Sequence, residues 1–365
     1  STRLGLQGVP SRGRMPAEGS VRVGLLGAGN FVRGVLLPAL KRVSGVELVS
    51  VCAATGLSAR QVGEKFGFRS CATDENEVFH DPAVNTVVIA TPHHLHAHQV
   101  LRALNAGKRV FCEKPLCLKE EELEEIVRAC QAASPLLMVG YNRRFAPMAL
   151  RLKAFLSEIR QPLVMHYRVN AGPLPPNHWL RDPDQGGGRV LGEVCHFVDF
   201  LIFLAGSLPA RLRAQGLGGA SAGDESVLVS LEFANGSVGS IAYVTGGDPA
   251  FCKESVEVFG GGSAAVLDDF RRLEMVRDGR RERRHSRWSQ DKGHRGEWWA
   301  FAHAAGSGGP PPIALLELVA TSLATCRIQH SRLTGRLVEM DAVGFMAAAL
   351  ARGREGPERD FARET

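Results

Sequence analysis

Short apolar runs alternate with helix-like segments over the first 142 residues. The runs predict strands at 21–26, 46–53, 86–90, 109–112 and 136–140. Between them, apolar positions at helical spacing predict helices over 31–43, 58–66, 95–106 and 119–133, with Ser58 as an N-cap. Continuous apolar runs are typical of parallel strands that are covered on both faces. The pattern predicts an α/β fold with a doubly wound parallel sheet of Rossmann type over 21–142.

From residue 143 the sequence pattern changes to one typical of short strands separated by turn residues. Strands are expected at 163–170, 209–216, 226–234, 237–245, 254–259, 263–268, 272–277 and 280–287. Asn235-Gly236 and Asp278-Gly279 are strong two-residue hairpin signals. With helices at 193–205, 294–305 and 314–331, this predicts an α+β domain over 143–340 with a large, mostly antiparallel open sheet. Residues 1–20 are expected to be an arm or linker, and 341–365 a charged tail.

Composition narrows the classes of protein to which the chain can belong. The 365 residues are 44% hydrophobic and 22% charged, which excludes disorder of the whole chain. No apolar run approaches the roughly 18 residues that span a bilayer, so no membrane partner is expected. Of the net charge of +6, most lies in residues 271–287, where eight arginines face three acidic residues. This indicates a solvated hairpin or a subunit edge and not a nucleic-acid-binding surface.

The eight cysteines are scattered and form no Cys-x-x-Cys pair. Reduced, buried thiols of a cytoplasmic protein are the expected state, and no signal peptide is visible in residues 1–20. His94 and His98 are spaced i, i+4 beside His93 and His96, which suggests a metal site. No cysteine or carboxylate completes a ligand set nearby, so no metal is predicted.

Gly27-x-Gly29 follows the first predicted strand and opens a helix. Glycines there allow a tight turn and a close approach of the backbone to a pyrophosphate, which then lies at the helix N-terminus. Asn30 and Phe31 continue this turn. The third glycine position of the usual pattern holds Val32 instead. The strand–turn–helix context predicts a dinucleotide site, with NAD or NADP as the cofactor.

The end of the second strand lacks the carboxylate that binds the adenosine ribose of NAD. It reads Cys52-Ala53-Ala54, followed by Thr55, Ser58 and Arg60. Thr55 and Ser58 are able to donate to a 2′-phosphate, and Arg60 to pair with it, which favours NADP weakly. An N-cap serine and a surface arginine are the equally simple structural alternative.

Several motifs together resemble the Gfo/Idh/MocA family (glucose–fructose oxidoreductase, inositol dehydrogenase and rhizopine catabolism proteins). They are Ala90-Thr91-Pro92-His93-His94-Leu95-His96, Glu113-Lys114-Pro115, Trp179-x-Arg181, Gly186-Gly187-Gly188 and His196-x-x-Asp199. The resemblance covers about residues 21–340. It is closest to the C-terminal half of bi-domain oxidoreductases, as suggested by Arg143-Arg144-Phe145 and by residues 192–199.

The resemblance implies roles for these residues. Hydride transfer needs a group that takes the hydroxyl proton, and Lys114 is implied as that group, touching the cofactor ribose as well. Glu113 is implied to orient Lys114 or to hold the ribose. The dinucleotide contacts are expected from Gly27, Gly29, Asn30, Phe31, Thr55, Ser58, Arg60, Thr91, Pro92, His93, His96, Glu113, Lys114 and Arg143. Besides Lys114 and His196, the substrate side is expected to include Tyr167, Trp179 and Arg181.

His196 and Asp199 lie on one face of a predicted helix, so both are candidates for proton transfer or substrate binding. Relatives are expected to carry an aspartate four residues before this histidine, where this chain has Gly192. Glu193 is the candidate replacement, although its direction on the helix differs by roughly 100°.

The implied function is an NAD(P)-dependent oxidoreductase acting on a hydroxyl or keto carbon of a sugar, cyclitol or nucleotide sugar. Two alternatives stay open: a non-catalytic NAD(P)-binding sensor or assembly protein, and an NAD-dependent glycosidase. A homodimer or homotetramer through the C-terminal sheet is expected from the resemblance.

Overall fold

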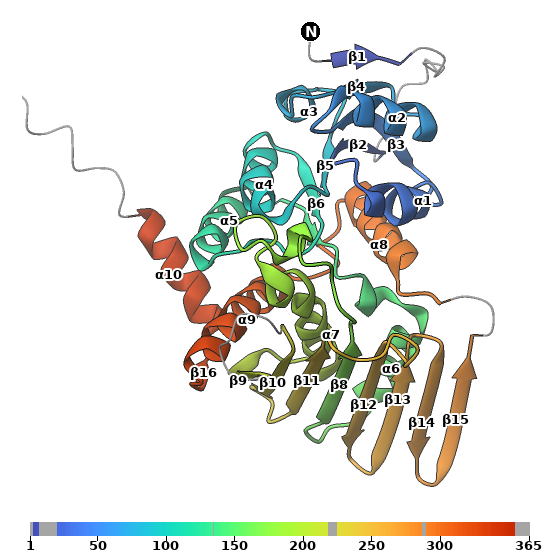
Figure 1. The fold of residues 1–365 in the computed structure, drawn as a ribbon, viewed down its shortest axis with the longest axis vertical. Coiled ribbons are helices and arrows are strands. Elements are labelled where there is room, and N and C mark those ends of the chain that lie inside the picture. The colour runs from blue at the N-terminus through green and yellow to red at the C-terminus, as the bar shows by residue number, and fades with distance from the viewer. Residues whose placement is uncertain (1–2, 7–19, 134, 218–224, 287–289, 355–365) are drawn as a thin grey trace, which may run out of the picture.

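The computed structural model describes residues 3–6, 20–133, 135–217, 225–286 and 290–354. They form two sheets, the smaller one above the larger in Figure 1. The upper sheet has the order β1-β4-β3-β2-β5-β6-β7 and is parallel except for β1. Its strands are β1 (Arg3–Gly5), β2 (Val21–Leu26), β3 (Val46–Cys52), β4 (Ser70–Ala72), β5 (Thr86–Ile89), β6 (Arg109–Cys112) and β7 (Leu137–Val139).

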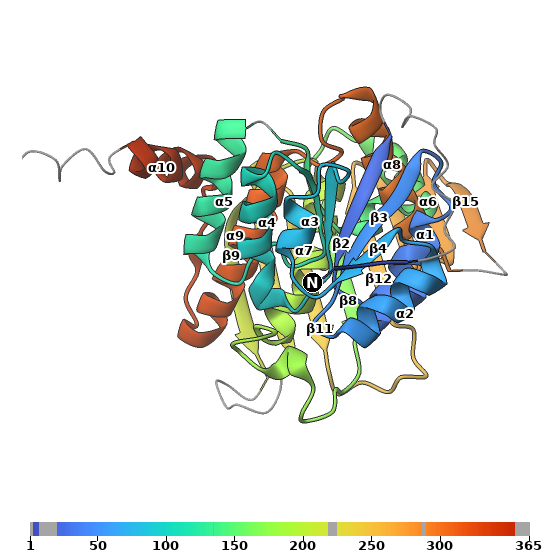
Figure 2. The same ribbon diagram turned by 90° about the horizontal axis from the view of Figure 1, so that it is seen from above.

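The helices of this part are α1 (Leu37–Leu40), α2 (Gly56–Phe66), α3 (Asn76–Phe79), α4 (His96–Asn105) and α5 (Glu120–Ala133). In Figure 2, α1 and α2 lie together on one side of the view and α4 and α5 on the other. Every residue of β5 is buried, as expected for a strand covered on both faces. The predicted α/β class with a Rossmann sheet is confirmed.

Besides β4 and α3, which were not predicted, three local details differ from the prediction. Residues 3–5, expected in an arm, form edge strand β1 and pair with β4. Helix α2 is capped by Thr55, whose hydroxyl accepts a hydrogen bond from the Ser58 amide, so the N-cap lies three residues before the predicted one. The helix expected over 31–43 starts as a π-helical turn, Val32–Leu36, and continues as the short α1.

The lower sheet has the order β15-β14-β13-β12-β8-β11-β10-β9-β16, with only the β8–β11 pair parallel among the described strands. The strands are β8 (Val164–Asn170), β9 (Pro209–Gly216), β10 (Val227–Phe233), β11 (Val238–Val244), β12 (Glu254–Gly260), β13 (Ser263–Asp268), β14 (Arg272–Arg277), β15 (Arg280–His285) and β16 (Val338–Glu339). Burial alternates along the central strands, because one face packs against α6, α7 and α9. The predicted large, mostly antiparallel sheet is confirmed.

The remaining helices are α6 (Pro147–Ser157), α7 (Cys195–Ala205), α8 (His294–Ser307), α9 (Leu315–Thr334) and α10 (Ala342–Arg354). Helix α8 was expected to close the second domain, but it packs against β2 and α1 of the Rossmann part, where Figure 1 shows it beside α1. Trp298 of α8 stacks on Phe111 of β6, with ring centroids 4.0 Å apart. The two parts therefore share one apolar core. Residues 342–354 of the expected tail form α10, which packs on α5 and α9.

The arginine-rich segment forms the β14–β15 hairpin at the edge of the lower sheet. Asp278 and Gly279 turn it with φ of 51° and 70°. Five of the six residues of β15 are exposed, which agrees with the expected solvated hairpin. Arg287 lies outside the described residues. Glu274 accepts a hydrogen bond from Arg283, so part of the positive charge is neutralised locally.

All eight cysteines are free thiols, as the sequence predicts. Among the helices that the structure describes, none has the length and apolar content that crossing a bilayer requires.

Candidate functional site

A cavity of about 1050 Å³ lies where the carboxyl ends of the parallel strands face the second domain. Ligands of open α/β sheets bind in this crevice. Residues just after β2, β3, β5 and β6 form one wall, and residues of the second domain form the other. The lining includes Gly27, Gly29, Asn30, Phe31, Ala53, Ala54, Thr73, Glu75, Thr91, Pro92, His93, His96, Gln99, Glu113, Lys114, Asn142, Arg143, His178, Trp179, Gln185, His196, Lys292 and His294.

The turn after β2 is shaped by its two glycines. Gly27 has φ of +106°, and a Cβ there would lie 2.2 Å from the Ala90 carbonyl oxygen. A Cβ at Gly29 would meet no atom within 4 Å, which leaves an open cradle at the start of the helical segment. Val32, at the third glycine position, is buried in the core. The turn thus fits the close backbone approach that a pyrophosphate needs.

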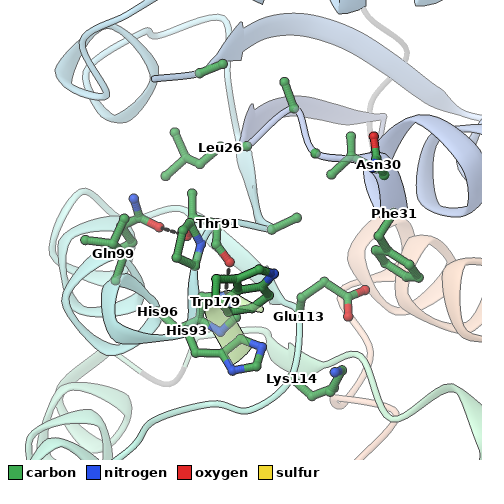
Figure 3. A pocket seen from close by; sticks show the side chains of 18 of the residues that line it. Leu26, Asn30, Phe31, Thr91, His93, His96, Gln99, Glu113, Lys114 and Trp179 are labelled. Carbon is green, nitrogen blue, oxygen red and sulfur yellow. Dashed lines mark hydrogen bonds between the residues drawn. The ribbon is translucent and has the colours of Figure 1, made fainter. Parts of the chain in front are cut away.

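The segment after β5 is held by a network of hydrogen bonds. The Thr91 hydroxyl donates to Gln99 Oε1 at 2.6 Å, a bond drawn in Figure 3. His96 is fully buried, and its ring nitrogens lie 2.7 Å from the Pro115 oxygen and 2.9 Å from the Thr91 oxygen. Burial lowers the pKa of His96 to about 4, so the ring is neutral and donates to only one of the two carbonyls. His96 therefore fastens the Thr91 segment to the segment after β6.

His93 faces the second domain across the cavity. Its Nδ1 lies 2.9 Å from the Gly186 carbonyl oxygen. Burial and the nearby Lys114 lower the pKa of His93 to about 2, so it is a neutral donor to that carbonyl. Trp179 meets His93 edge to face, with ring centroids 4.7 Å apart, as Figure 3 shows.

Lys114 and Glu113 follow β6. Lys114 Nζ donates to the Gly192 carbonyl oxygen at 2.8 Å. The Glu113 carboxyl is buried against Gly140, where a Cβ would lie 3.0 Å from its Oε1. Burial, together with the nearby Glu297, raises the pKa of Glu113 to about 7. A carboxyl group that titrates near neutral pH therefore stands next to the lysine.

His196 lies in the first turn of α7 and reaches the same cavity. Its ring meets Tyr141 edge to face at 6.2 Å. Burial and the cationic Arg143 lower the pKa of His196 well below its ordinary value, so the ring is neutral. Its Nδ1 is buried without a hydrogen-bond partner among the described residues. Since Nδ1 is itself shielded from the cavity, it is other atoms of the His196 ring that line it.

Gly192 occupies the position where relatives are expected to carry an aspartate. A Cβ at Gly192 would lie 2.5 Å from Leu180 Cδ1 and 2.9 Å from His93 Cε1. The space for a longer side chain is therefore filled. Gly192 lies in a π-helical turn, Val190–Val194, and contributes its carbonyl to Lys114 instead of a carboxylate.

Glu193, the predicted replacement for the missing carboxylate, does not line the cavity. Its Oε2 accepts hydrogen bonds from Tyr243 and from Arg189, and Glu193 is not among the cavity lining. The roughly 100° change of direction along the helix turns it toward the lower sheet.

Asp199, Tyr167 and Arg181 also contact structural partners instead of the cavity. Asp199 is fully buried and accepts a hydrogen bond from Arg144 Nε at 3.0 Å. The Tyr167 hydroxyl donates to Glu254 at 2.7 Å. Arg181 lies 3.7 Å from the Glu225 carboxylate. Each of these polar groups has a partner inside the second domain, so of the residues predicted for the substrate side, Lys114, Trp179 and His196 line the cavity.

At the adenosine end, Thr55, Ser58 and Arg60 lie beyond the lining residues Ala53 and Ala54. Thr55 and Ser58 form the cap of α2, and Arg60 pairs with Glu64 at 2.7 Å on the exposed face of that helix. All three residues therefore have the structural roles that the sequence offered as the alternative to binding a 2′-phosphate.

Sequence reasoning missed three residues that line the cavity: Asn142, which follows β7, Lys292 in the loop before α8, and His294 at the start of α8. Asn142 Nδ2 donates to the Lys292 carbonyl oxygen at 2.7 Å. The one sequence signal was Gly293, whose φ is +93° and whose Cβ would lie 2.1 Å from the Asn142 oxygen. Within the described ranges, no cluster of three or more His, Cys, Asp or Glu residues is arranged to hold a metal ion.

The chain is similar to several curated dehydrogenases. It is 29% identical to levoglucosan dehydrogenase of Pseudarthrobacter phenanthrenivorans, over 50% of this chain and 55% of that protein. It is 32% identical to 1,5-anhydro-D-fructose reductase of Ensifer adhaerens, over 53% and 59%. These matches span little more than half of either relative. Myo-inositol 2-dehydrogenase of Thermotoga maritima is 27% identical, over 70% of this chain and 78% of that protein.

Solved structures share the fold. Levoglucosan dehydrogenase in complex with NADH and levoglucosan superposes with a TM-score of 0.77 at 23% identity, covering 88% of this chain and 99% of that chain. Aldose-aldose oxidoreductase from Caulobacter crescentus, in complex with glycerol, gives 0.77 at 19% identity, covering 88% and 100%.

Family models match both parts of the chain. The oxidoreductase family with an NAD-binding Rossmann fold matches residues 21–141, and the GFO/IDH/MocA C-terminal domain matches 158–263. Together they cover more than half of the chain, and Thr91, Lys114 and His196 from the motifs of the sequence resemblance line the cavity. The chain belongs to the Gfo/Idh/MocA family of oxidoreductases.

Proposed function

We propose that the chain is an NAD(P)-dependent oxidoreductase that transfers a hydride between nicotinamide and a hydroxyl or keto carbon of a sugar, cyclitol or nucleotide sugar. One observation carries the proposal: a single cavity joins the open turn at Gly29 to Lys114 and His196. A dinucleotide in that turn and a small polyol beside the lysine fit its volume of about 1050 Å³. The named relatives act on sugars and cyclitols, which supports this substrate class.

The dinucleotide would be held by Gly27, Gly29 and the residues after β5 and β6, and when bound it supplies the hydride acceptor or donor. Lys114 Nζ is the group that exchanges a proton with the substrate oxygen, because it reaches the cavity and is anchored by the Gly192 carbonyl. His196, whose ring lines the cavity, binds the same or the neighbouring hydroxyl. Trp179, half exposed at the cavity, covers one side of the sugar.

The cofactor preference that we propose is NADP. It is supported by the absence of a carboxylate among Cys52, Ala53 and Ala54 at the end of β3. Arg60 pairs with Glu64 in an exposed i, i+4 arrangement that water screens, so a 2′-phosphate is able to compete for the guanidinium.

The oligomeric state that we propose is a dimer or tetramer through the outer face of the lower sheet. Large apolar side chains that are exposed there are Val164, Leu228, Val238, Val244 and Phe259. A second copy would bury this apolar face. The eight free thiols support a reducing compartment, the cytoplasm, as its location.

The proposal is tested by following reduced nicotinamide absorbance with both cofactors over a panel of polyols, cyclitols and nucleotide sugars. Turnover with at least one member supports hydride transfer. Tight cofactor binding without turnover across the panel, together with an unaffected Lys114→Ala protein, overturns it in favour of a sensor. Hydrolysis without net change in the cofactor identifies a glycosidase.

A further inference from the structure

Three cationic side chains line the part of the cavity that faces the second domain. They are Lys114 after β6, Arg143 before α6 and Lys292 before α8. The side chains of Arg143 and Lys292 are only 10% and 18% exposed. Charges held this far from water need compensation, either from the protein or from a ligand.

The protein compensates two of these charges with one carboxylate. Glu254 accepts hydrogen bonds from two nitrogens of Arg143, at 2.8 and 2.9 Å. It also accepts from Lys292 Nζ at 2.6 Å and from the Tyr167 hydroxyl at 2.7 Å. The Glu254 carboxylate is 1% exposed, and these contacts hold its pKa well below its ordinary value. Arg143, Lys292 and Glu254 together therefore carry one excess positive charge.

Lys114 adds a second positive charge, since its hydrogen-bond partner is the neutral Gly192 carbonyl. The two carboxyl groups that line the cavity do not fully balance this excess. Glu75 is already paired with Arg102. Glu113 is partly protonated near neutral pH, because burial raises its pKa to about 7. Among the described lining residues, the substrate side is therefore net positive.

A neutral polyol does not explain this arrangement. Hydroxyl groups are bound equally well by amides and neutral histidines, which the cavity supplies at Asn142, His196 and His294. A partly buried guanidinium beside an ammonium is instead the usual recognition of a carboxylate or phosphate. The pyrophosphate of the cofactor has its own place at the glycine turn.

We propose that the substrate of this protein is an acidic sugar, whose carboxylate or phosphate binds at Lys292 and Arg143 while Lys114 faces the reacting carbon. This inference rests on the proposed function, and it narrows the substrate class to anionic sugars. The position of Lys292 makes it a specificity-determining residue.

Calorimetric titration of the intact protein with saturating NADPH or NADH tests the inference on matched ligands. The panel pairs D-glucose with D-glucuronate and D-glucose 6-phosphate, and D-galactose with D-galacturonate and D-galactose 6-phosphate. At least one acid or phosphate ester is expected to bind about tenfold more tightly than its neutral partner, and less tightly at about 0.3 M salt. The carboxylates and the phosphate esters tell the two anions apart.

Lys292→Gln is expected to reduce this preference to about threefold or less, and Lys292→Arg to retain most of it. The matched control is Arg280→Gln, which removes one positive charge from the exposed β15 strand and leaves the preference unchanged. Unfolding curves of each variant check that the fold is intact. Equal binding of neutral and acidic sugars, no binding of any acid, or an unchanged preference in Lys292→Gln overturns the inference.

The same titrations separate this inference from the proposed function. Binding of acidic sugars without any binding of dinucleotide leaves the anion site standing and removes the oxidoreductase. Turnover of neutral polyols with equal kcat/KM in the wild type and in Lys292→Gln removes the anion site and leaves the oxidoreductase. A loss of NADPH affinity in Lys292→Gln as large as the loss of sugar affinity assigns the cations to the cofactor and also overturns the inference.

Discussion

The two walls of the cavity differ in the chemical groups that form their surfaces. On the Rossmann side, backbone and small side chains at the strand ends form the surface, as at Gly27, Gly29, Ala53 and Ala54. On the opposite side, long charged side chains are held in place by a buried carboxylate, Glu254. A backbone surface accepts the constant shape of a dinucleotide, whereas a network of charged side chains is set by the chemistry of one substrate. The fold therefore supplies the wall that is proposed to hold the cofactor, and individual side chains of the second domain supply the proposed specificity.

The largest effect is expected at the point where the two walls meet. Lys114→Ala removes the group proposed to carry the proton, and kcat is expected to fall about 10³-fold while the dinucleotide Kd changes less than about threefold. Steady-state rates and cofactor fluorescence titration measure the two quantities. A variant that retains kcat contradicts the assignment.

Glu193→Gln is the matched comparison for Lys114→Ala. Since its carboxylate contacts Tyr243 and Arg189 and not the cavity, kcat is expected to stay within about threefold of the wild type. A larger loss would restore Glu193 to the reacting centre.

Asp199→Asn tests whether Asp199 stabilises the second-domain wall of the cavity or takes part in the reaction. The substitution leaves the buried Arg144 guanidinium with Glu317 alone, and it is expected to lower the free energy of unfolding by about 3 kcal/mol. Urea unfolding measures this, with Glu232→Gln in an exposed ion pair as the control at about 0.5 kcal/mol. If kcat of the folded variant also falls about 100-fold, Asp199 belongs to the chemistry.

Glu113→Gln tests the carboxyl group beside the lysine. Burial raises the pKa of Glu113 to about 7 in the folded state, above its ordinary value of 4.5. The stability that its protonated form contributes is present at low pH and is lost as pH rises toward 7. Relative to the wild type, Glu113→Gln is expected to gain roughly 3 kcal/mol between about pH 4 and pH 8, measured by urea unfolding at each pH. A difference that does not change with pH contradicts the shifted pKa.

The smallest effect is expected at the adenosine end of the Rossmann wall, where Arg60 lies beyond the lining residues. Arg60→Ala is expected to lower the NADPH over NADH preference about fivefold, because a surface guanidinium is only partly engaged. Glu64→Ala, which frees Arg60, is expected to raise the preference slightly. Fluorescence titration with both cofactors checks this, and an unchanged ratio in Arg60→Ala removes the argument for NADP.

Most strands were predictable within one or two residues because each carries its own apolar pattern. The seven strands from 209 to 285 follow the alternation and the turn residues closely. Two details were missed because alternatives compete locally. Thr55, and not Ser58, caps α2, and β1 forms because residues 3–5 pair with the edge of β4.

The predictable part of the site is the part that follows strand ends. The glycine turn, Thr91, Glu113 and Lys114 reach the cavity because parallel strands end at one edge. Lys292 and the partners of Asp199 and Glu193 depend on contacts between residues far apart in the sequence, such as Arg143 with Glu254, 111 positions away. No local pattern encodes such pairs.

The most direct test of the central claim is a fluorescence titration of Gly29→Glu with NADPH and NADH. A Cβ at Gly29 meets no atom within 4 Å, so we expect the variant to fold and to place a carboxylate in the phosphate cradle. Gly34→Glu is the matched control, since Gly34 is equally open and lies outside the cavity. We expect the wild type and Gly34→Glu to bind the dinucleotide and Gly29→Glu to lose at least about tenfold in affinity. No binding by the wild type, or equal binding by Gly29→Glu, would contradict the account.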